Sequence, residues 1–137
     1  MSGVHVRLRV GGESYAFGVE HVLEVAELGE IAPVPGAPAG VLGVRNLRGQ
    51  VLPVFELASV FGIKREGAAR GLLVVEHEGR RAGFAIDEVV DVGVLAAPSE
   101  SAESAFLHGA VLDNGELIGV VDVPQLFRTL AQEGAEA

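Results

Sequence analysis

The side chains that could do acid–base or metal chemistry are scattered along this sequence of 137 residues. The four histidines are His5, His21, His77 and His108. None of them stands four residues from a second histidine or a carboxylate, the spacing of a metal site on a helix. The sequence has no cysteine, which excludes thiolate ligands, disulfides and thiol redox chemistry. We therefore expect the histidines to be satisfied surface residues, and we expect no metal site.

The remaining candidates for catalysis have structural explanations. The neighbouring carboxylates Asp87 and Glu88 fit charge-rich strand margins better than a general acid and base. No serine lies in a nucleophile elbow. The stretch GVLGVRNLRG, from Gly40 to Gly49, has the spacing of neither a dinucleotide-binding loop nor a P-loop, so Gly40 and Gly43 more plausibly mark close backbone approaches or bulges. The sequence thus predicts no catalytic residues and no cofactor.

Charge and hydropathy narrow the classes of partner. Ten basic and nineteen acidic residues give a net charge of −9, which argues against nucleic acid as a partner. No long uncharged run suits a transmembrane helix, and arginines interrupt the N-terminal stretch MSGVHVRLRV, so it is not a signal peptide. The absence of cysteine fits a reducing cytoplasm. We expect a cytoplasmic protein without direct membrane insertion. The initiating methionine and the form of the C-terminus favour a stand-alone protein over a piece of a larger kinase.

The elements that would position a binding site are mostly β-strands. Apolar residues alternate with polar ones from Val4 to Val10, which is typical of a half-buried strand. Two further hairpins are predicted, one turning near Glu78-Gly79 and one at Asp113-Asn114-Gly115. A helical period appears near Leu57–Phe61 and more clearly from Val123 to Leu130. Segments 32–40, 64–71 and 97–105 have the composition of loops.

An internal repeat organises the chain. The block GESYAFGVEHVLEV from Gly12 aligns without gaps with GRRAGFAIDEVVDV from Gly79. The block from Gly43, GVRNLRGQVLPVFELASVF, aligns in the same way with GAVLDNGELIGVVDVPQLF from Gly109. The sequence therefore predicts a single domain over 1–137 with related halves near 1–66 and 67–137, each closing as a small β-barrel packed beside the other.

The repeat draws attention to the turn Asn46-Leu47-Arg48-Gly49. Arg48 aligns with Asn114, and Leu47 aligns with Asp113. The second half therefore has residues that are common in turns, whereas the first half has a leucine and an arginine at the same positions. We expect Asn46 to bond the local backbone, Leu47 to anchor the loop against its own barrel, and Arg48 to point outward and contact a partner protein. The alternative is a structural Arg48, paired with Glu56 or another carboxylate of the domain.

At residues 20–57 the sequence resembles the CheW family of chemotaxis coupling proteins. The similarity lies in Val22-Leu23-Glu24-Val25, the proline-rich loop Pro33–Pro38, and the block GVRNLRGQVLPVFEL from Gly43 to Leu57. Both blocks of the second half are similar too. The resemblance implies two five-stranded, SH3-like barrels around a shared hydrophobic core with short helices. It also implies a non-enzymatic adaptor that couples chemoreceptors to a CheA-type histidine kinase.

The resemblance also implies partners and contact positions. The cytoplasmic tip of a chemoreceptor would dock in an apolar groove between the barrels, and the barrel ends would contact the kinase regulatory domain, which associates the protein with receptor arrays at the membrane. The implied partner-binding residues are Val22, Glu24, Gly43, Arg48, Leu72 and Val92. Val22, Leu72 and Val92 would form groove wall, Gly43 would permit a close backbone approach, and Arg48 would make a directional contact at the rim.

The chain departs from the family pattern at Gly40 and Leu42, where many relatives carry a bulky apolar and a basic residue, and in the short segment 93–107. A scaffold for pilus-driven or gliding motility or for developmental signalling remains an alternative. Two further alternatives are a small β-barrel that binds a ligand or acts as an enzyme, which lacks a convergent polar site, and a nucleic-acid-binding barrel, which the net charge opposes.

Overall fold

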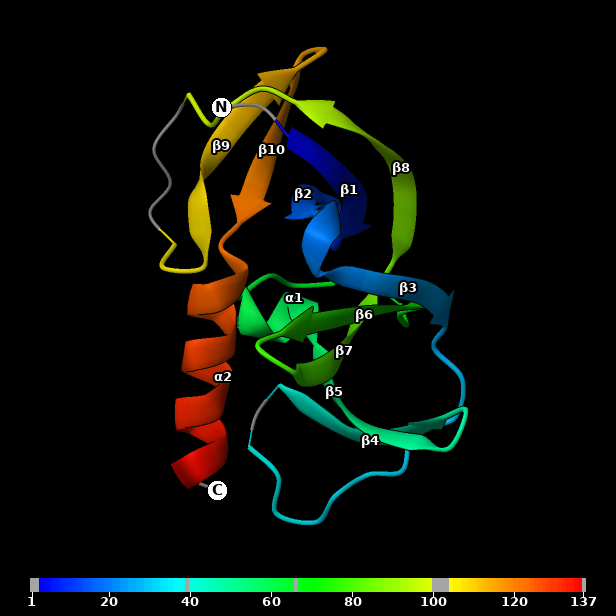
Figure 1. Cartoon of the computed structure of the whole chain (residues 1–137). Helices are drawn as coiled ribbons and strands as arrows, with labels where there is room; N and C mark the ends of the chain where they lie inside the picture. Colours follow the sequence, from blue (N-terminus) through cyan, green and yellow to red (C-terminus); the bar gives the residue numbers. More distant parts are fainter. Residues whose placement is uncertain (1–2, 39, 66, 100–103, 137) are drawn as a thin grey trace.

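The computed structural model describes residues 3–38, 40–65, 67–99 and 104–136, and it consists of two five-stranded sheets packed together with few helices (Figure 1). The predicted mostly-β class is confirmed. The first sheet contains β1 (Gly3–Val10), β2 (Glu13–Gly18), β8 (Glu88–Leu95), β9 (Leu107–Asp113) and β10 (Glu116–Val121). The second contains β3 (Val22–Glu27), β4 (Val41–Leu47), β5 (Gln50–Glu56), β6 (Gly71–His77) and β7 (Arg80–Ile86).

The two halves of the sequence exchange strands, which corrects the prediction that each half closes as its own barrel. The first sheet has the order β8-β1-β2-β10-β9, and the second has the order β3-β6-β7-β5-β4. A 3₁₀ turn at Val19–His21 carries the chain from β2 into the other sheet, where β3 pairs with β6. The strands β8 to β10 cross in the opposite direction. Neither strand order pairs its two end strands, so among the described residues backbone bonds leave both barrels open.

The repeat is visible in the register of the strands. In the parallel pair of β5 and β7, Val54 lies opposite Gly83, and in the parallel pair of β10 and β2 the equivalent Val120 lies opposite Ala16. A short stretch of loop forms backbone hydrogen bonds with each of the end strands β4 and β9. Ala32 bonds Val44 in both directions, and the amide of the equivalent Ser99 donates to Ala110. These covered edges are protected from pairing with another chain.

The main hydrophobic core lies between the sheets and draws on both halves. Phe17 of β2 and Phe84 of β7 are fully buried there, with ring centroids 6.2 Å apart. The C-terminal helix α2 (Val123–Glu136) adds Leu126 and Phe127 to this core, while the short helix α1 (Leu57–Val60) adds Leu57. Among the described residues no helix is both long and apolar enough to cross a bilayer.

The start of α2 is capped by the side chain of Asp122. The Asp122 carboxylate accepts a hydrogen bond from the amide of Gln125 at 3.0 Å, and Pro124 occupies the first turn, where no backbone donor is needed. The side chains of the helix up to Leu130 alternate between core and surface with helical period.

Tyr15, the only tyrosine of the chain, provides a test of this packing. Its ring lies 4.7 Å from that of Phe61, and burial, assisted by the charge of Glu13, raises the pKa of Tyr15 to about 12. Because the folded pKa exceeds the unfolded value near 10, this contribution to stability is complete below about pH 10 and lost as the pH rises through 12. We expect phenolate absorbance to titrate near pH 12 in the folded protein and near 10 in denaturant. A folded-state midpoint of 10 would contradict the packing.

Candidate functional site

Each barrel has a mouth beside one hairpin tip, and the repeat relates the two mouths. The Arg7 mouth has a volume of about 100 Å³, and the Arg48 mouth has a volume of about 240 Å³. The Arg7 mouth is lined by Arg7, Leu8, Ser14, Val90, Asp113, Asn114, Glu116 and Ile118. The Arg48 mouth is lined by Leu23, Glu24, Leu47, Arg48, Gln50, Leu52, Val74 and Arg81. Repeat-equivalent positions line both mouths, but Val74 stands where the first barrel has Arg7.

The hairpin tip at the Arg48 mouth has the predicted local geometry. The Asn46 side-chain oxygen accepts a hydrogen bond from the amide of Gly49 at 3.0 Å, which confirms the expected bond to local backbone. Leu47 packs on a buried cluster that contains Leu52 and Leu72, which confirms its anchoring role. Arg48 and Gly49 have φ angles of 49° and 83°, as a tight hairpin turn with two left-handed residues requires. Asn114 and Gly115 have φ angles of 50° and 77°, so both halves use the same turn.

Arg48 projects from this tip and pairs with Glu24. Its guanidinium bonds the Glu24 carboxylate on β3, although 68% of the Arg48 side chain is exposed. Glu56, the partner considered from sequence, instead lies 3.4 Å from a guanidinium nitrogen of Arg65. The structure therefore brings two of the predicted site residues together. The pair links the tip of the β4–β5 hairpin to the end strand β3, and no backbone hydrogen bond within the described part of the chain does so.

Gly43 allows a close backbone approach, but the approaching backbone belongs to its own chain. Its φ is 144°, and a Cβ at this position would lie 2.1 Å from the carbonyl oxygen of Ala32. Ala32 is the residue that bridges to Val44 and holds the loop after β3 against β4. In this conformation Gly43 is buried and shapes the domain rather than offering contact surface.

The three predicted groove residues have different environments. Val92 on β8 is 58% exposed and is available to a partner. Val22 at the start of β3 is half-buried and packs against the main core. Leu72 is fully buried beneath the Arg48 mouth, so the expectation that it forms groove wall is wrong in this structure. Its strand β6 is covered on both faces. The continuous apolar run Leu72–Val75 is typical of such a strand, and the sequence analysis did not use this signal.

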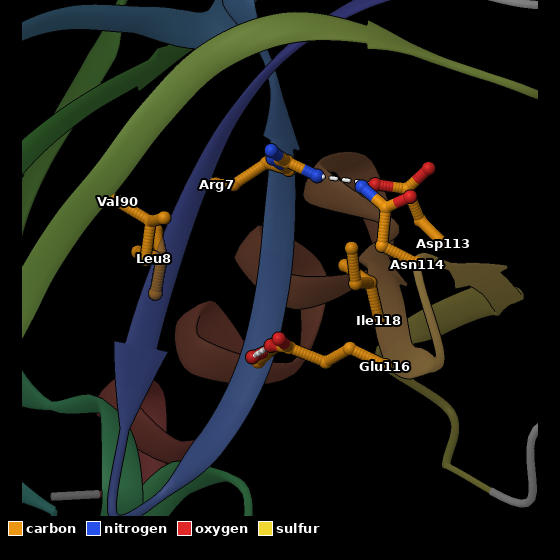
Figure 2. A pocket seen from close by; sticks show the side chains of 8 residues that line it. Arg7, Leu8, Val90, Asp113, Asn114, Glu116 and Ile118 are labelled. Atoms are coloured by element: carbon orange, nitrogen blue, oxygen red, sulfur yellow. Dashed lines mark hydrogen bonds and ion pairs between the residues drawn. The ribbon is translucent and has the colours of Figure 1, made fainter.

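Sequence reasoning missed the polar network of the Arg7 mouth (Figure 2). Arg7 on β1 binds the Asp91 carboxylate on β8 in a two-pronged manner, and its Nη1 lies 2.6 Å from Asp113 at the end of β9. Deeper in the mouth, the Ser14 hydroxyl donates to Glu116. In the sequence, Arg7 lies between apolar residues of an alternating strand, a pattern that by itself indicates only a solvent-exposed side chain. The available signal was Asp113, an acid where the other half has Leu47.

This network predicts an acid-dependent loss of stability. The hydrogen bond from Arg7 lowers the pKa of Asp91, and the hydrogen bond from Ser14 lowers the pKa of Glu116. A lowered folded pKa gives stability that is present above the unfolded values near 4 and lost as the pH falls below them. Urea unfolding at pH 7 and pH 3 should show that Arg7→Leu costs more at pH 7. An equal cost at both values would show that the ion pairs contribute nothing.

Two histidines lie close together in the fold, and a third lies beside a carboxylate. The rings of His21 and His77 lie 6.0 Å apart, and His108 Nδ1 is 3.5 Å from Asp122. Even so, no three histidines or carboxylates among the described residues are placed to hold a metal ion.

The comparisons with known proteins decide the family. Residues 5–131 match the CheW-like domain. The chain belongs to the CheW-like domain family. It is similar to the chemotaxis protein CheW of Rhizobium meliloti, with 29% identity over 95% of this chain and 90% of that protein. It is also similar to protein FrzA of Myxococcus xanthus, with 31% identity over 90% of this chain and 84% of that protein.

A solved structure supports the fold of this CheW-like domain. The crystal structure of the scaffolding protein TtCheW from Thermoanaerobacter tengcongensis superposes with a TM-score of 0.82, at 27% identity and over 93% of this chain and 88% of that chain. Because the match covers 93% of this chain, it extends over both sheets and is not confined to residues 20–57. As a member of this family the chain is a non-enzymatic adaptor, in agreement with the sequence-based prediction.

Proposed function

We propose that this adaptor couples chemoreceptors to a CheA-type histidine kinase in the cytoplasm. The observation that carries the proposal is the Arg48 mouth, a depression at the end of its barrel that apolar and charged side chains line together. Leu47, Leu52 and Val74 give it an apolar floor, and Arg48 presents an exposed guanidinium beside it. A surface of this kind suits a partner that inserts an apolar side chain and offers an acceptor to the arginine.

The receptor tip would use a different surface. Val92 lies on the end strand β8 between two other exposed valines, Val90 and Val94. Together the three side chains form an apolar strip that is exposed to water, and contact with a partner would bury it. A helical receptor tip could bury these side chains with its own apolar stripe. Val22 would contribute only its exposed part. Two separate surfaces for two partners are what a coupling protein requires.

The experiment is a pair of binding titrations with the kinase regulatory domain and a receptor-tip fragment from the same genome. Arg48→Ala should weaken binding of the kinase domain, whereas Val92→Asp should weaken binding of the receptor tip, each with little effect on the other partner. Binding of neither partner by the unmodified protein would contradict the proposal. The same titrations with a kinase and receptor of a motility system without flagella test the alternative pathway.

A further inference from the structure

The end strand β8 is held by few side chains at the place where it presents Val92. Between Val89, which packs on the core, and the buried Leu95, its side chains are exposed or only half-buried. The ladder between β8 and β1 pairs Val92 with Val6, but it shifts register between Arg7 and Leu8, so the backbone pairing is irregular at Val90, next to Asp91. Side-chain packing therefore holds β8 at Val89 and Leu95, and the residues between them depend on the ladder and on polar contacts.

Arg7 supplies the missing attachment. It lies directly opposite Asp91 in the ladder and binds both oxygens of that carboxylate, one residue before Val92. Its other terminal nitrogen reaches Asp113, on the strand at the opposite end of the same sheet. Only 24% of the Arg7 side chain is exposed, so these bonds are better shielded than those of the exposed Arg48. One side chain thus links both end strands of a sheet that backbone bonds leave open.

The second barrel shows that this link is not required by the fold. Its equivalent of Arg7 is Val74, and the tip residue Arg48 reaches Glu24 directly. The first barrel has the opposite arrangement, with the arginine on β1, beside the end strand β8, and acids on both end strands. Either arrangement holds a hairpin tip against an end strand. On β8, Arg9 reaches the first residue, Glu88, at 3.6 Å, whereas Arg7 holds the residue next to Val92.

We propose that Arg7 is a positioning residue for the receptor-binding face of β8, holding Val92 in place through Asp91 and Asp113. This inference rests on the proposed function for the identity of the partner. It does not require Arg7 to touch that partner. Asp113 matters because it fixes Arg7 from the far side, so a change there should also loosen β8 without altering the strand itself.

The test compares Arg7→Leu with Arg9→Leu, which removes the same charge from the same strand but reaches β8 at its first residue, Glu88, and leaves Asp91 and Asp113 intact. Hydrogen exchange of the β8 amides around Val92 should accelerate in Arg7→Leu and, more weakly, in Asp113→Asn, but not in Arg9→Leu, where any change should stay near Glu88. Affinity for the receptor tip should fall about tenfold in Arg7→Leu and less than about twofold in Arg9→Leu. Affinity for the kinase domain should stay unchanged in all three.

Two results would overturn the inference. One is β8 exchange that stays at the unmodified rate in Arg7→Leu. The other is acceleration spread evenly over all strands, which indicates general destabilisation. Because exchange needs no partner, these results remain decisive even if the unmodified protein fails to bind a receptor tip, an outcome that would count against the proposed function alone.

Discussion

Gly43→Ala should lower the free energy of unfolding by about 3 kcal/mol. The added methyl group would stand 2.1 Å from the Ala32 carbonyl oxygen, and the φ of 144° is one that residues with a side chain rarely adopt. The neighbour is backbone that is itself bonded to Val44, so it cannot move away without losing the bridge. Urea denaturation of the variant and the unmodified protein measures the loss directly.

Gly93→Ala is the matched control. Gly93 also lies in a strand, but it has an ordinary φ and open space around its Cα, so alanine there should change stability by no more than about 0.5 kcal/mol. A Gly43→Ala protein as stable as this control, with the Val44 amide still protected from exchange, would contradict the close approach. Weak partner binding by Gly43→Ala would in turn be attributed to the displaced loop, since Gly43 offers no contact surface.

Arg48→Ala should weaken binding to the partner at its mouth by about 1–2 kcal/mol and change the free energy of unfolding by only about 0.5 kcal/mol. The ion pair with Glu24 is largely exposed on the arginine side, and such pairs contribute little to stability. Arg48 adopts a positive φ, which asparagine tolerates better than arginine or alanine. Arg48→Asn, which copies the turn of the other half, should therefore be at least as stable as the unmodified protein.

The two Arg48 variants separate contact from structure. Both should lose the same affinity, although their stabilities differ, because both lack the guanidinium. Glu24→Gln removes the internal partner and leaves Arg48 in place, so its binding loss should be smaller. A large fall in melting temperature of Arg48→Ala with unchanged affinity for both receptor tip and kinase domain would show that Arg48 is only structural.

Local patterns in the sequence predicted the elements well, because each depends on neighbouring residues. The alternation of apolar and polar residues predicted β1, and the dipeptide Asn114-Gly115 predicted the turn between β9 and β10. The exchange of strands between halves was not predictable in the same way. A gapless repeat is equally compatible with two self-contained barrels, and only the direction of the chain after Val19–His21 decides between them.

The local geometry of the Arg48 turn was predictable from the sequence, whereas the contacts that depend on distant pairing were not. Asn46 and Leu47 act within their own hairpin, so their roles followed from turn chemistry. The family resemblance implies that Leu72 forms a groove wall, but the position of a residue along β6 says nothing about which residues cover it. The contacts of Arg7 join strands far apart in the sequence, and only comparison of Asp113 with Leu47 could have indicated them.

The central claim is that this chain couples receptor to kinase, and reconstitution tests it most directly. Receptor signalling fragments and the histidine kinase of the same genome are combined with or without the adaptor, and kinase autophosphorylation is followed while receptor occupancy is changed. The account predicts that the kinase responds to the receptor only when the adaptor is present, and that Arg48→Ala and Val92→Asp each reduce this response. A kinase response that is the same with and without the adaptor would contradict it.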